Sequence, residues 1–116
     1  MSDTPREVVE RYFAAERRLD SDAVMACFDE DAVLVGPDGT RHAGRTAIRA
    51  FYESLYTGLE RLDVWTVDDV TAGASAAIEW EANVIGRDGA KHLRGVNVVA
   101  THDGLVAELR VYFTVC

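Results

Sequence analysis

The residues in this sequence that could do chemistry stand in apolar, regularly spaced surroundings. Tyr12 and Glu16 are four positions apart in a helical pattern, so they share one helix face. Asn97 lies between Gly95 and Val99 in a strand-like alternation, where an unpaired buried amide would cost about 1–3 kcal/mol. A tyrosine hydroxyl and an asparagine amide both donate hydrogen bonds, so each could contact a polar group of a ligand. Each could equally make a structural hydrogen bond in the core, and both interpretations stay open.

A polar loop from Gly36 to Gly44 offers two further candidates. Asp38 and His42 could act as an acid or a base if this loop folds back over a pocket. Pro-Asp-Gly is also what a type I turn prefers, and a histidine on a polar loop is usually solvated. The turn and the solvated side chain are therefore the simpler interpretations of Asp38 and His42. Glu16 is expected at the rim between helix and sheet.

Capping signals and periodicity predict the elements that would position these residues. Thr4, Pro5 and Glu7 mark the start of a first helix, whose apolar residues recur at helical spacing as far as Leu19. The order of all expected elements predicts an α+β domain with its helices on one face of a curved sheet. The remaining elements are a short helix capped by Asp20 or Ser21, a strand over Ala32–Val35, a helix that starts near Arg45 and stops before Gly58, and four strands over Leu62–Thr71, Ala76–Gly86, Lys91–Thr101 and Leu105–Val115.

Alternation along the strands assigns each side chain to one face of the sheet. The face that holds Trp80, Asn97 and Leu109 is expected to point toward the helices. The other face is apolar in places as well, because Val96 and Val98 lie on it. A second apolar face predicts a homodimer that forms through the outward face of the sheet.

Length and composition limit the class of protein. The chain has 116 residues, of which 48% are hydrophobic and 28% charged, and this predicts a single domain over residues 1–116. The formal net charge of −8 disfavours nucleic acid and anionic membranes as partners. No apolar run reaches the roughly 20 residues of a membrane span, and no signal peptide is expected. Cys27 and Cys116 are far apart, have no metal-binding spacing and indicate a cytoplasmic location.

Three stretches of the chain resemble the nuclear transport factor 2-like (NTF2-like) superfamily, and more narrowly its ketosteroid isomerase and SnoaL-like polyketide cyclase branch. They are Arg11–Gly39, with RYFAAE at its start, AGRTAIRAFYESL at Ala43–Leu55, and DGLVAELRVYF at Asp103–Phe113. The resemblance implies a cone-shaped fold, in which three N-terminal helices pack on a strongly curved, mostly antiparallel sheet around an apolar pocket. It does not imply one activity, since this fold hosts enzymes, binders and assembly modules.

Residue by residue, the resemblance to the isomerases is partial. Tyr12 matches their oxyanion-hole tyrosine, and Tyr52 matches a tyrosine that supports it, while Phe28 stands where a third tyrosine would be. Asn97 falls, within one residue, where the isomerases have a protonated aspartic acid donor. Gly36 stands where they have the aspartate that shuttles the proton. The resemblance therefore implies a donor pair without its usual base.

The function expected from these observations is an isomerase- or cyclase-like enzyme for an apolar, polyketide- or steroid-like carbonyl compound, without metal or cofactor. Tyr12 and Asn97 would stabilise an enolate, and Asp38, His42 or a water would serve as base. The substrate would lie against Phe28, Tyr52, Trp80, Val99, Val111 and Phe113, and Trp65 could extend the aromatic wall.

Three alternatives use the same fold. The chain could be a non-catalytic binder of apolar small molecules, or a dimeric assembly module with a filled cone. An epoxide hydrolase would need an inward Asp-Arg-Asp set, and alternation places Arg94 and Arg110 on the outward face, which disfavours that chemistry.

Overall fold

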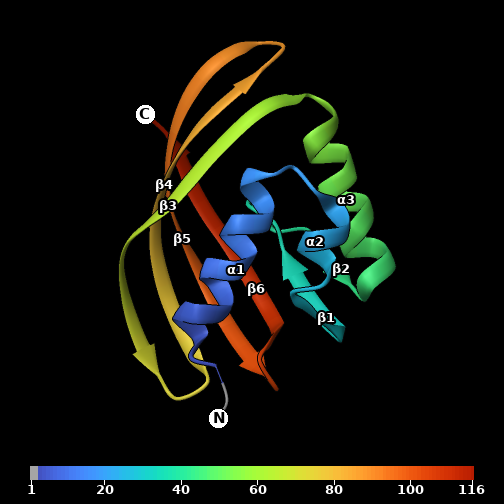
Figure 1. Cartoon of the computed structure of the whole chain (residues 1–116), viewed down its shortest axis with the longest axis vertical. Coiled ribbons are helices and arrows are strands. Elements are labelled where there is room, and N and C mark those ends of the chain that lie inside the picture. The colour runs from blue at the N-terminus through green and yellow to red at the C-terminus, as the bar shows by residue number, and fades with distance from the viewer. Residues whose placement is uncertain (1–2) are drawn as a thin grey trace.

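The computed structural model describes residues 3–116, in which three helices lie on one side of a six-stranded sheet (Figure 1). The sheet has the order β2-β1-β6-β5-β4-β3; β1 runs parallel to β6, and the other neighbours are antiparallel. The helices are α1 (Pro5–Arg17), α2 (Ser21–Met25) and α3 (Arg45–Thr57). The strands are β1 (Phe28–Val35), β2 (Arg41–Ala43), β3 (Leu59–Ala72), β4 (Ser75–Gly86), β5 (Gly89–His102) and β6 (Leu105–Val115). This confirms the α+β fold expected from the sequence.

The helix starts follow the capping signals in the sequence. The Thr4 side chain accepts a hydrogen bond from the Glu7 N–H, and the Glu7 carboxylate accepts one from the Thr4 N–H, which completes a capping box at α1. The Asp20 carboxylate accepts from the Ala23 N–H and caps α2. These caps fix where α1 begins and where the chain turns into α2, and so fix the helix face that carries Tyr12.

Strand limits differ from the expectation at the edge of the sheet. β1 begins at Phe28 rather than Ala32, and β3 begins at Leu59 rather than Leu62. β2, which pairs with the end of β1, falls in a stretch expected to be a loop. The added positions include charged, exposed side chains such as Glu30 and Glu60. β3 is an edge strand, and β2 covers only Val33–Val35 of β1, so these positions border water and tolerate charge. The charged residues hide the strand pattern in the sequence.

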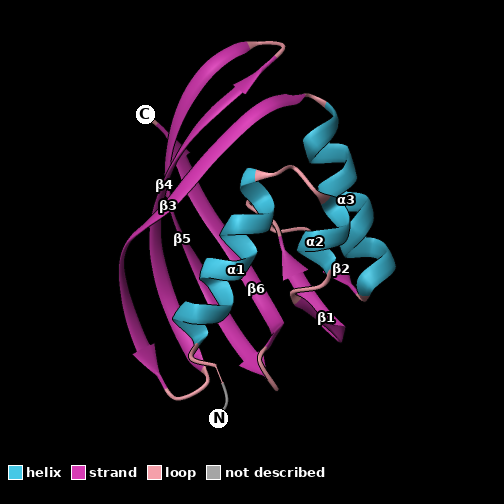
Figure 2. Cartoon of the chain, viewed as in Figure 1, coloured by secondary structure: helices cyan, strands magenta, loops and turns pink. Residues whose placement is uncertain are grey.

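The sheet is strongly curved around the helices (Figure 2). Its pairing register shifts between Thr66 and Asp68 in β3 and between Ala100 and Thr101 in β5. Such bulges bend and twist a strand. The predicted alternation is confirmed on the inner side, where Ile78, Trp80 and Asn97 are all buried. No helix within residues 3–116 is long and apolar enough to cross a bilayer.

Candidate functional site

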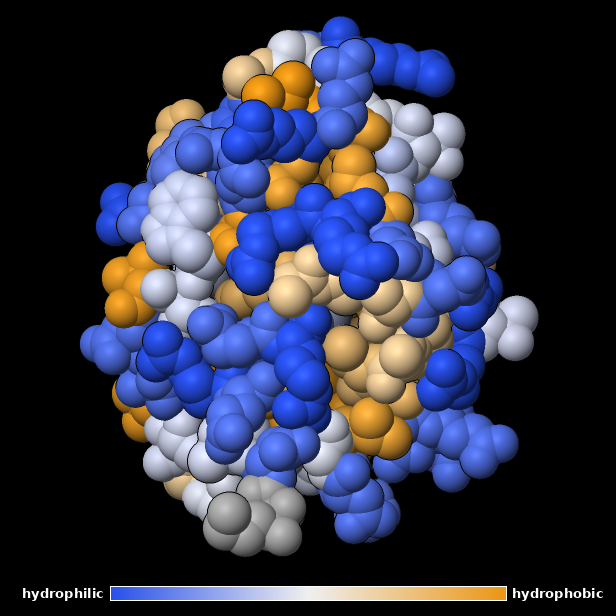
Figure 3. Space-filling model, in the orientation of Figure 1, coloured by the Kyte–Doolittle hydropathy of each residue, from blue (hydrophilic) through white to orange (hydrophobic). Residues whose placement is uncertain are grey.

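An apolar cavity of about 270 Å³ lies between α1, α3 and the inner face of β3–β6. Pro37, Leu55 and Phe113 line it and are exposed to solvent, so they form its mouth. In the space-filling view, apolar surface reaches the outside in the upper part of this face, between polar side chains (Figure 3). The remaining wall residues are Tyr12, Phe13, Glu16, Phe51, Tyr52, Leu59, Leu62, Val64, Trp80, Ala82, Val84, Leu93, Asn97 and Val111.

Asn97 presents a hydrogen-bond donor to this cavity. Its Oδ1 accepts a hydrogen bond of 2.9 Å from the indole Nε1–H of Trp80. Because an indole nitrogen only donates, the amide oxygen must face Trp80 and the amide nitrogen must face the other way. No hydrogen bond among the described residues involves this nitrogen. Every fully buried side-chain polar atom of these residues has a partner, so the nitrogen is not fully buried. The Nδ2–H₂ group is therefore accessible from the cavity that Asn97 lines.

Tyr12 and Tyr52 form a hydroxyl pair at the helix side of the cavity. The two hydroxyls share a short hydrogen bond, and both residues are almost completely buried. Burial raises the pKa of each phenol well above its ordinary value, and the nearby Glu16 carboxylate raises both further. Both groups are therefore neutral at physiological pH. If Tyr52 donates to Tyr12, the Tyr12 hydroxyl keeps its own proton, which it can donate to the Glu16 carboxylate or to a ligand in the cavity.

Glu16 contributes a carboxyl group to the cavity wall. The hydroxyl of Tyr56, on α3, donates a hydrogen bond of 3.0 Å to Glu16 Oε2. Burial raises the pKa of the Glu16 carboxyl from 4.5 to about 7, although the hydroxyls of Tyr56 and Tyr12 act in the opposite direction. None of the ion pairs among residues 3–116 includes Glu16.

Neither loop candidate reaches the cavity. Asp38 is exposed, and its carboxylate accepts a hydrogen bond of 2.9 Å from the Thr40 N–H, which lowers its pKa. This hydrogen bond agrees with the interpretation of Pro-Asp-Gly as a turn. The His42 ring packs at a tilt against Phe51, with 4.9 Å between ring centroids, and lines a separate outer hollow. Phe51 separates that hollow from the cavity, because it lines both.

The cavity contains four of the six side chains expected to contact a substrate: Tyr52, Trp80, Val111 and Phe113. Phe28 and Val99 are fully buried and lie outside the wall. Phe28 packs edge-on against Tyr12, at 5.9 Å between centroids, so it supports that ring instead of a ligand. Trp65 is 39% exposed and lies beside His92, so it is not part of the aromatic wall.

Sequence reasoning did not select Glu16 and Tyr56 as site residues. Glu16 was expected at a rim, whereas its side chain is buried in the wall. The available signal was its spacing of four from Tyr12 on α1, matched by the same spacing between Tyr52 and Tyr56 on α3. The resemblance, which pairs Tyr52 with Tyr12, already implied that the two helices meet here, and Glu16 and Tyr56 lie one turn further along them.

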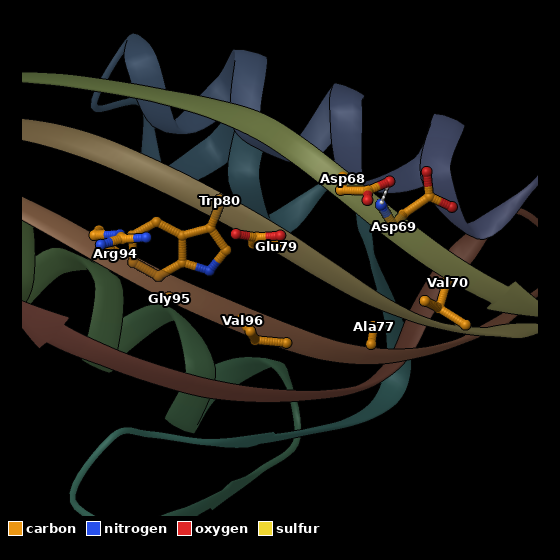
Figure 4. A pocket seen from close by; sticks show the side chains of 9 residues that line it. All are labelled: Asp68, Asp69, Val70, Ala77, Glu79, Trp80, Arg94, Gly95 and Val96. Atoms are coloured by element: carbon orange, nitrogen blue, oxygen red, sulfur yellow. Dashed lines mark hydrogen bonds between the residues drawn. The ribbon is translucent and has the colours of Figure 1, made fainter.

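A second hollow, of about 370 Å³, lies on the opposite face of the sheet. Figure 4 shows the carboxylates of Asp68 and Glu79 along one border of this hollow, opposite the side chains of Ala77 and Val96. The acidic side chains are exposed, so they remain hydrated and offer a ligand little advantage over water. No group of three or more potential metal ligands gathers anywhere in residues 3–116.

The curved sheet, its three helices and the apolar cavity with few inward polar groups define an NTF2-like protein. The chain belongs to the SnoaL-like domain family, whose model matches residues 9–109. This confirms the resemblance drawn from the sequence. No curated protein sequence matches the chain significantly.

Solved structures agree on the fold. A protein with a ketosteroid isomerase-like fold from Catenulispora acidiphila, in complex with trimethylamine, has a TM-score of 0.85 and 19% identity, over 97% of this chain and 88% of its own. A proposed SnoaL-like polyketide cyclase from Shewanella denitrificans has a TM-score of 0.84 and 14% identity, over 95% and 90%. The epoxide hydrolase/cyclase-like enzyme SalBIII, which has a role in pyran ring formation in salinomycin, has a TM-score of 0.82 and 21% identity, over 95% and 90%. The fold is thus of the cyclase and isomerase type.

Proposed function

We propose that this protein binds an apolar carbonyl compound in its cavity and stabilises the enolate of that compound, as an isomerase or a cyclase would. The observation that carries the proposal is the Asn97 amide nitrogen, which is accessible from a mostly apolar cavity that Tyr12 also lines. Two donors in the wall of one mostly apolar cavity suit an oxygen that gains negative charge during a reaction.

The environment of these donors supports the proposal. Asn97 cannot ionise, and the raised pKa of Tyr12 keeps its hydroxyl protonated, so both remain donors at physiological pH. Apolar side chains surround them and exclude water, which strengthens a hydrogen bond to a developing charge. Removal of one such donor typically lowers a rate about 10²–10³-fold.

Two related reactions, epoxide opening and isomerisation by a loop aspartate, fit the cavity less well. Epoxide opening by an Asp-Arg-Asp set is disfavoured, because no Asp or Arg lines the cavity. Isomerisation with an aspartate on the loop is disfavoured, because Gly36 occupies that position and Asp38 points into solvent. A Cβ at Gly36 would lie 3.5 Å from the Phe51 ring, so the position still borders the cavity wall.

The test is a fluorescence titration with 2-naphthol, whose naphtholate form resembles a planar enolate. Tyr12→Phe should weaken binding about fivefold or more, equivalent to about 1 kcal/mol, because one donor is lost. Tyr112→Phe is the matched control, since it removes the same hydroxyl from an exposed tyrosine on the outward face. Equal weakening by both variants, or no binding to the unaltered protein, would contradict the proposal.

A non-catalytic binder is the second candidate, and the Gly36 position favours it. Such a protein would bind 2-naphthol through Tyr12 and Asn97 but would turn over no enolisable ketone. Turnover of any such ketone removes this candidate.

We further propose that the protein forms a homodimer through the outward sheet face and acts in the cytoplasm. The outward side chains of Val70, Val98 and Tyr112 are 75%, 41% and 53% exposed, and burial of this apolar surface would favour association. Light scattering tests the dimer, and a monomer at micromolar concentration would contradict it.

A further inference from the structure

We propose that Glu16 is the proton acceptor of this site, that Tyr56 positions it, and that the substrate is an enolisable ketone of about two-ring size. This inference rests on the proposed function and supplies the base that the loop lacks. In this assignment the catalytic carboxylate comes from α1, on the same helix as the Tyr12 donor.

The position of Glu16 carries the first part of the argument. Glu16 and Asn97 are the two polar residues among the buried described residues, and both line the cavity. Tyr12 and Glu16 lie one helical turn apart, with about 5–6 Å between their Cβ atoms. The Tyr12 hydroxyl also lies close enough to the Glu16 carboxylate to lower its pKa. In the proposed complex, a ketone bound at Tyr12 therefore brings its C–H groups next to that carboxylate.

The groups around Glu16 leave its carboxylate free to accept a proton. Tyr12 on its own helix and Tyr52 and Tyr56 on α3 are the titratable groups that face it. The strands opposite contribute Leu62, Val64 and Ala82, among other uncharged cavity residues. Without a cation beside it, the carboxylate is not held in its ionised form, and its pKa of about 7 matches that of a general base at neutral pH.

Tyr56 is a positioning residue, because it does not line the cavity. It is buried, packs on Tyr52 at 5.7 Å between ring centroids, and donates its hydrogen bond to Oε2. One carboxylate oxygen is thereby fixed on the α3 side, and in the proposed complex the other oxygen accepts the proton. The same bond stabilises the ionised form and so keeps the pKa of Glu16 lower than burial alone would make it.

The cavity volume limits the size of the substrate. About 270 Å³ is somewhat less than twice an apolar cavity of 150 Å³ that holds one benzene. Two fused rings therefore fill the space, and a four-ring compound would extend through the mouth formed by Pro37, Leu55 and Phe113.

The proposed step is a reversible proton transfer. The C–H bond next to the carbonyl breaks, and its electron pair forms the carbon–carbon double bond of the enolate. The carbonyl π electrons move to the oxygen, which accepts hydrogen bonds from Asn97 and Tyr12. The proton passes to Glu16, which becomes neutral. The Glu16 carboxyl then exchanges this proton with solvent, so delivery of a solvent deuteron to the same carbon gives exchange. Delivery of the proton or deuteron to a conjugated carbon gives an isomer.

The experiment follows deuterium incorporation into 2-tetralone in D₂O by NMR. This ketone has two fused rings, and 2-naphthol is a planar analogue of its enol. Glu16→Gln should slow exchange at least about 100-fold, because it removes the base and preserves shape. Glu10→Gln is the matched control: it makes the same change on the exposed side of α1 and should exchange like the unaltered protein. Binding of 2-naphthol to Glu16→Gln should be unchanged or tighter.

The pH dependence of the exchange rate distinguishes a positioning role of Tyr56 from a packing role. Tyr56→Phe removes the bond that favours the ionised carboxylate, so the midpoint of the exchange rate against pH should move upward. A lower rate with an unmoved midpoint would overturn the role of Tyr56.

The outcomes also distinguish this inference from the proposed function. Binding of 2-naphthol without exchange of 2-tetralone, or equal exchange in Glu16→Gln, overturns Glu16 as base and leaves the enolate-binding cavity standing. Absence of 2-naphthol binding to the unaltered protein overturns the proposed function, and the inference falls with it.

Discussion

The two faces of the sheet use the same strands for different purposes. On the inner face of β4 and β5, Trp80, Ala82 and Asn97 are buried, and no charged side chain from these strands enters the cavity. On the outer face, Glu81 lies opposite Arg94 in the strand register. The Glu81 carboxylate accepts a hydrogen bond from His92. Adjacent residues of one strand thus lie in an apolar and a hydrated environment.

This difference explains why the inner face keeps its polar groups few and neutral. A charge on the outer face is solvated and costs little, whereas a charge in the cavity must be desolvated. The carboxyl group in the cavity wall is that of Glu16, which comes from a helix. The comparison therefore predicts large effects for inner-face substitutions and small ones for chemically similar changes outside.

The largest effect is expected at Gly95, where the inner face has no space for a side chain. An added Cβ would lie 2.4 Å from Trp80 Cζ2 and 2.4 Å from the Tyr112 carbonyl oxygen. Gly95→Val should therefore lower the free energy of unfolding by about 3 kcal/mol or more, at the upper end of overpacking effects, as measured by urea denaturation. Gly58→Ala is the control, because nothing lies within 4 Å of its Cβ position. Equal losses in both variants would contradict the packing argument.

The next effect is a dependence of stability on pH that is due to Glu16. Its pKa is raised from 4.5 to about 7 on folding, so the unfolded chain ionises first as pH rises. The contribution of Glu16 to the free energy of unfolding is therefore complete below pH 4.5, and it is lost as the pH rises from 4.5 to 7. The shift of about 2.5 units corresponds to about 3 kcal/mol.

Urea denaturation of the unaltered protein and Glu16→Gln across this pH range checks the prediction. As the pH rises from 4.5 to 7, the free energy of unfolding of the unaltered protein should fall relative to that of Glu16→Gln. The difference between the two proteins should level off above pH 7. Parallel curves would show that Glu16 titrates as it does in the unfolded chain.

A smaller loss is expected when Asn97 is replaced. Asn97→Leu leaves the Trp80 Nε1–H without an acceptor in the core, which should cost about 1–3 kcal/mol in the free energy of unfolding. The variant also lacks the Nδ2 donor, so it should bind 2-naphthol more weakly at equal folded fraction. Unaltered stability would indicate that water replaces the amide oxygen.

Features that depend on neighbouring residues can be predicted from this sequence, whereas contacts between distant residues are harder to predict. The capping box at Thr4 and the alternation that turns Trp80 and Asn97 inward are local, so helix start and strand face follow from neighbouring residues. The Glu16–Tyr56 contact joins residues 40 positions apart, and it depends on how α1 and α3 pack. The Pro-Asp-Gly signal at Asp38 is local as well, and the turn that it favoured over a catalytic role is the one that the structure shows.

The smallest effect is expected for Glu81 on the outer face, where the chemical change is the same as at Glu16. Glu81→Gln removes a carboxylate that contacts His92 Nε2 at 2.8 Å, with both side chains about a third exposed. Such a partly exposed pair contributes no more than about 1 kcal/mol, so the free energy of unfolding should change by less than that. Exchange of 2-tetralone should be unaffected, because the other face of the sheet holds the cavity. A loss of exchange in Glu81→Gln would show that the two faces are coupled through β4, and the contrast between them would then not hold.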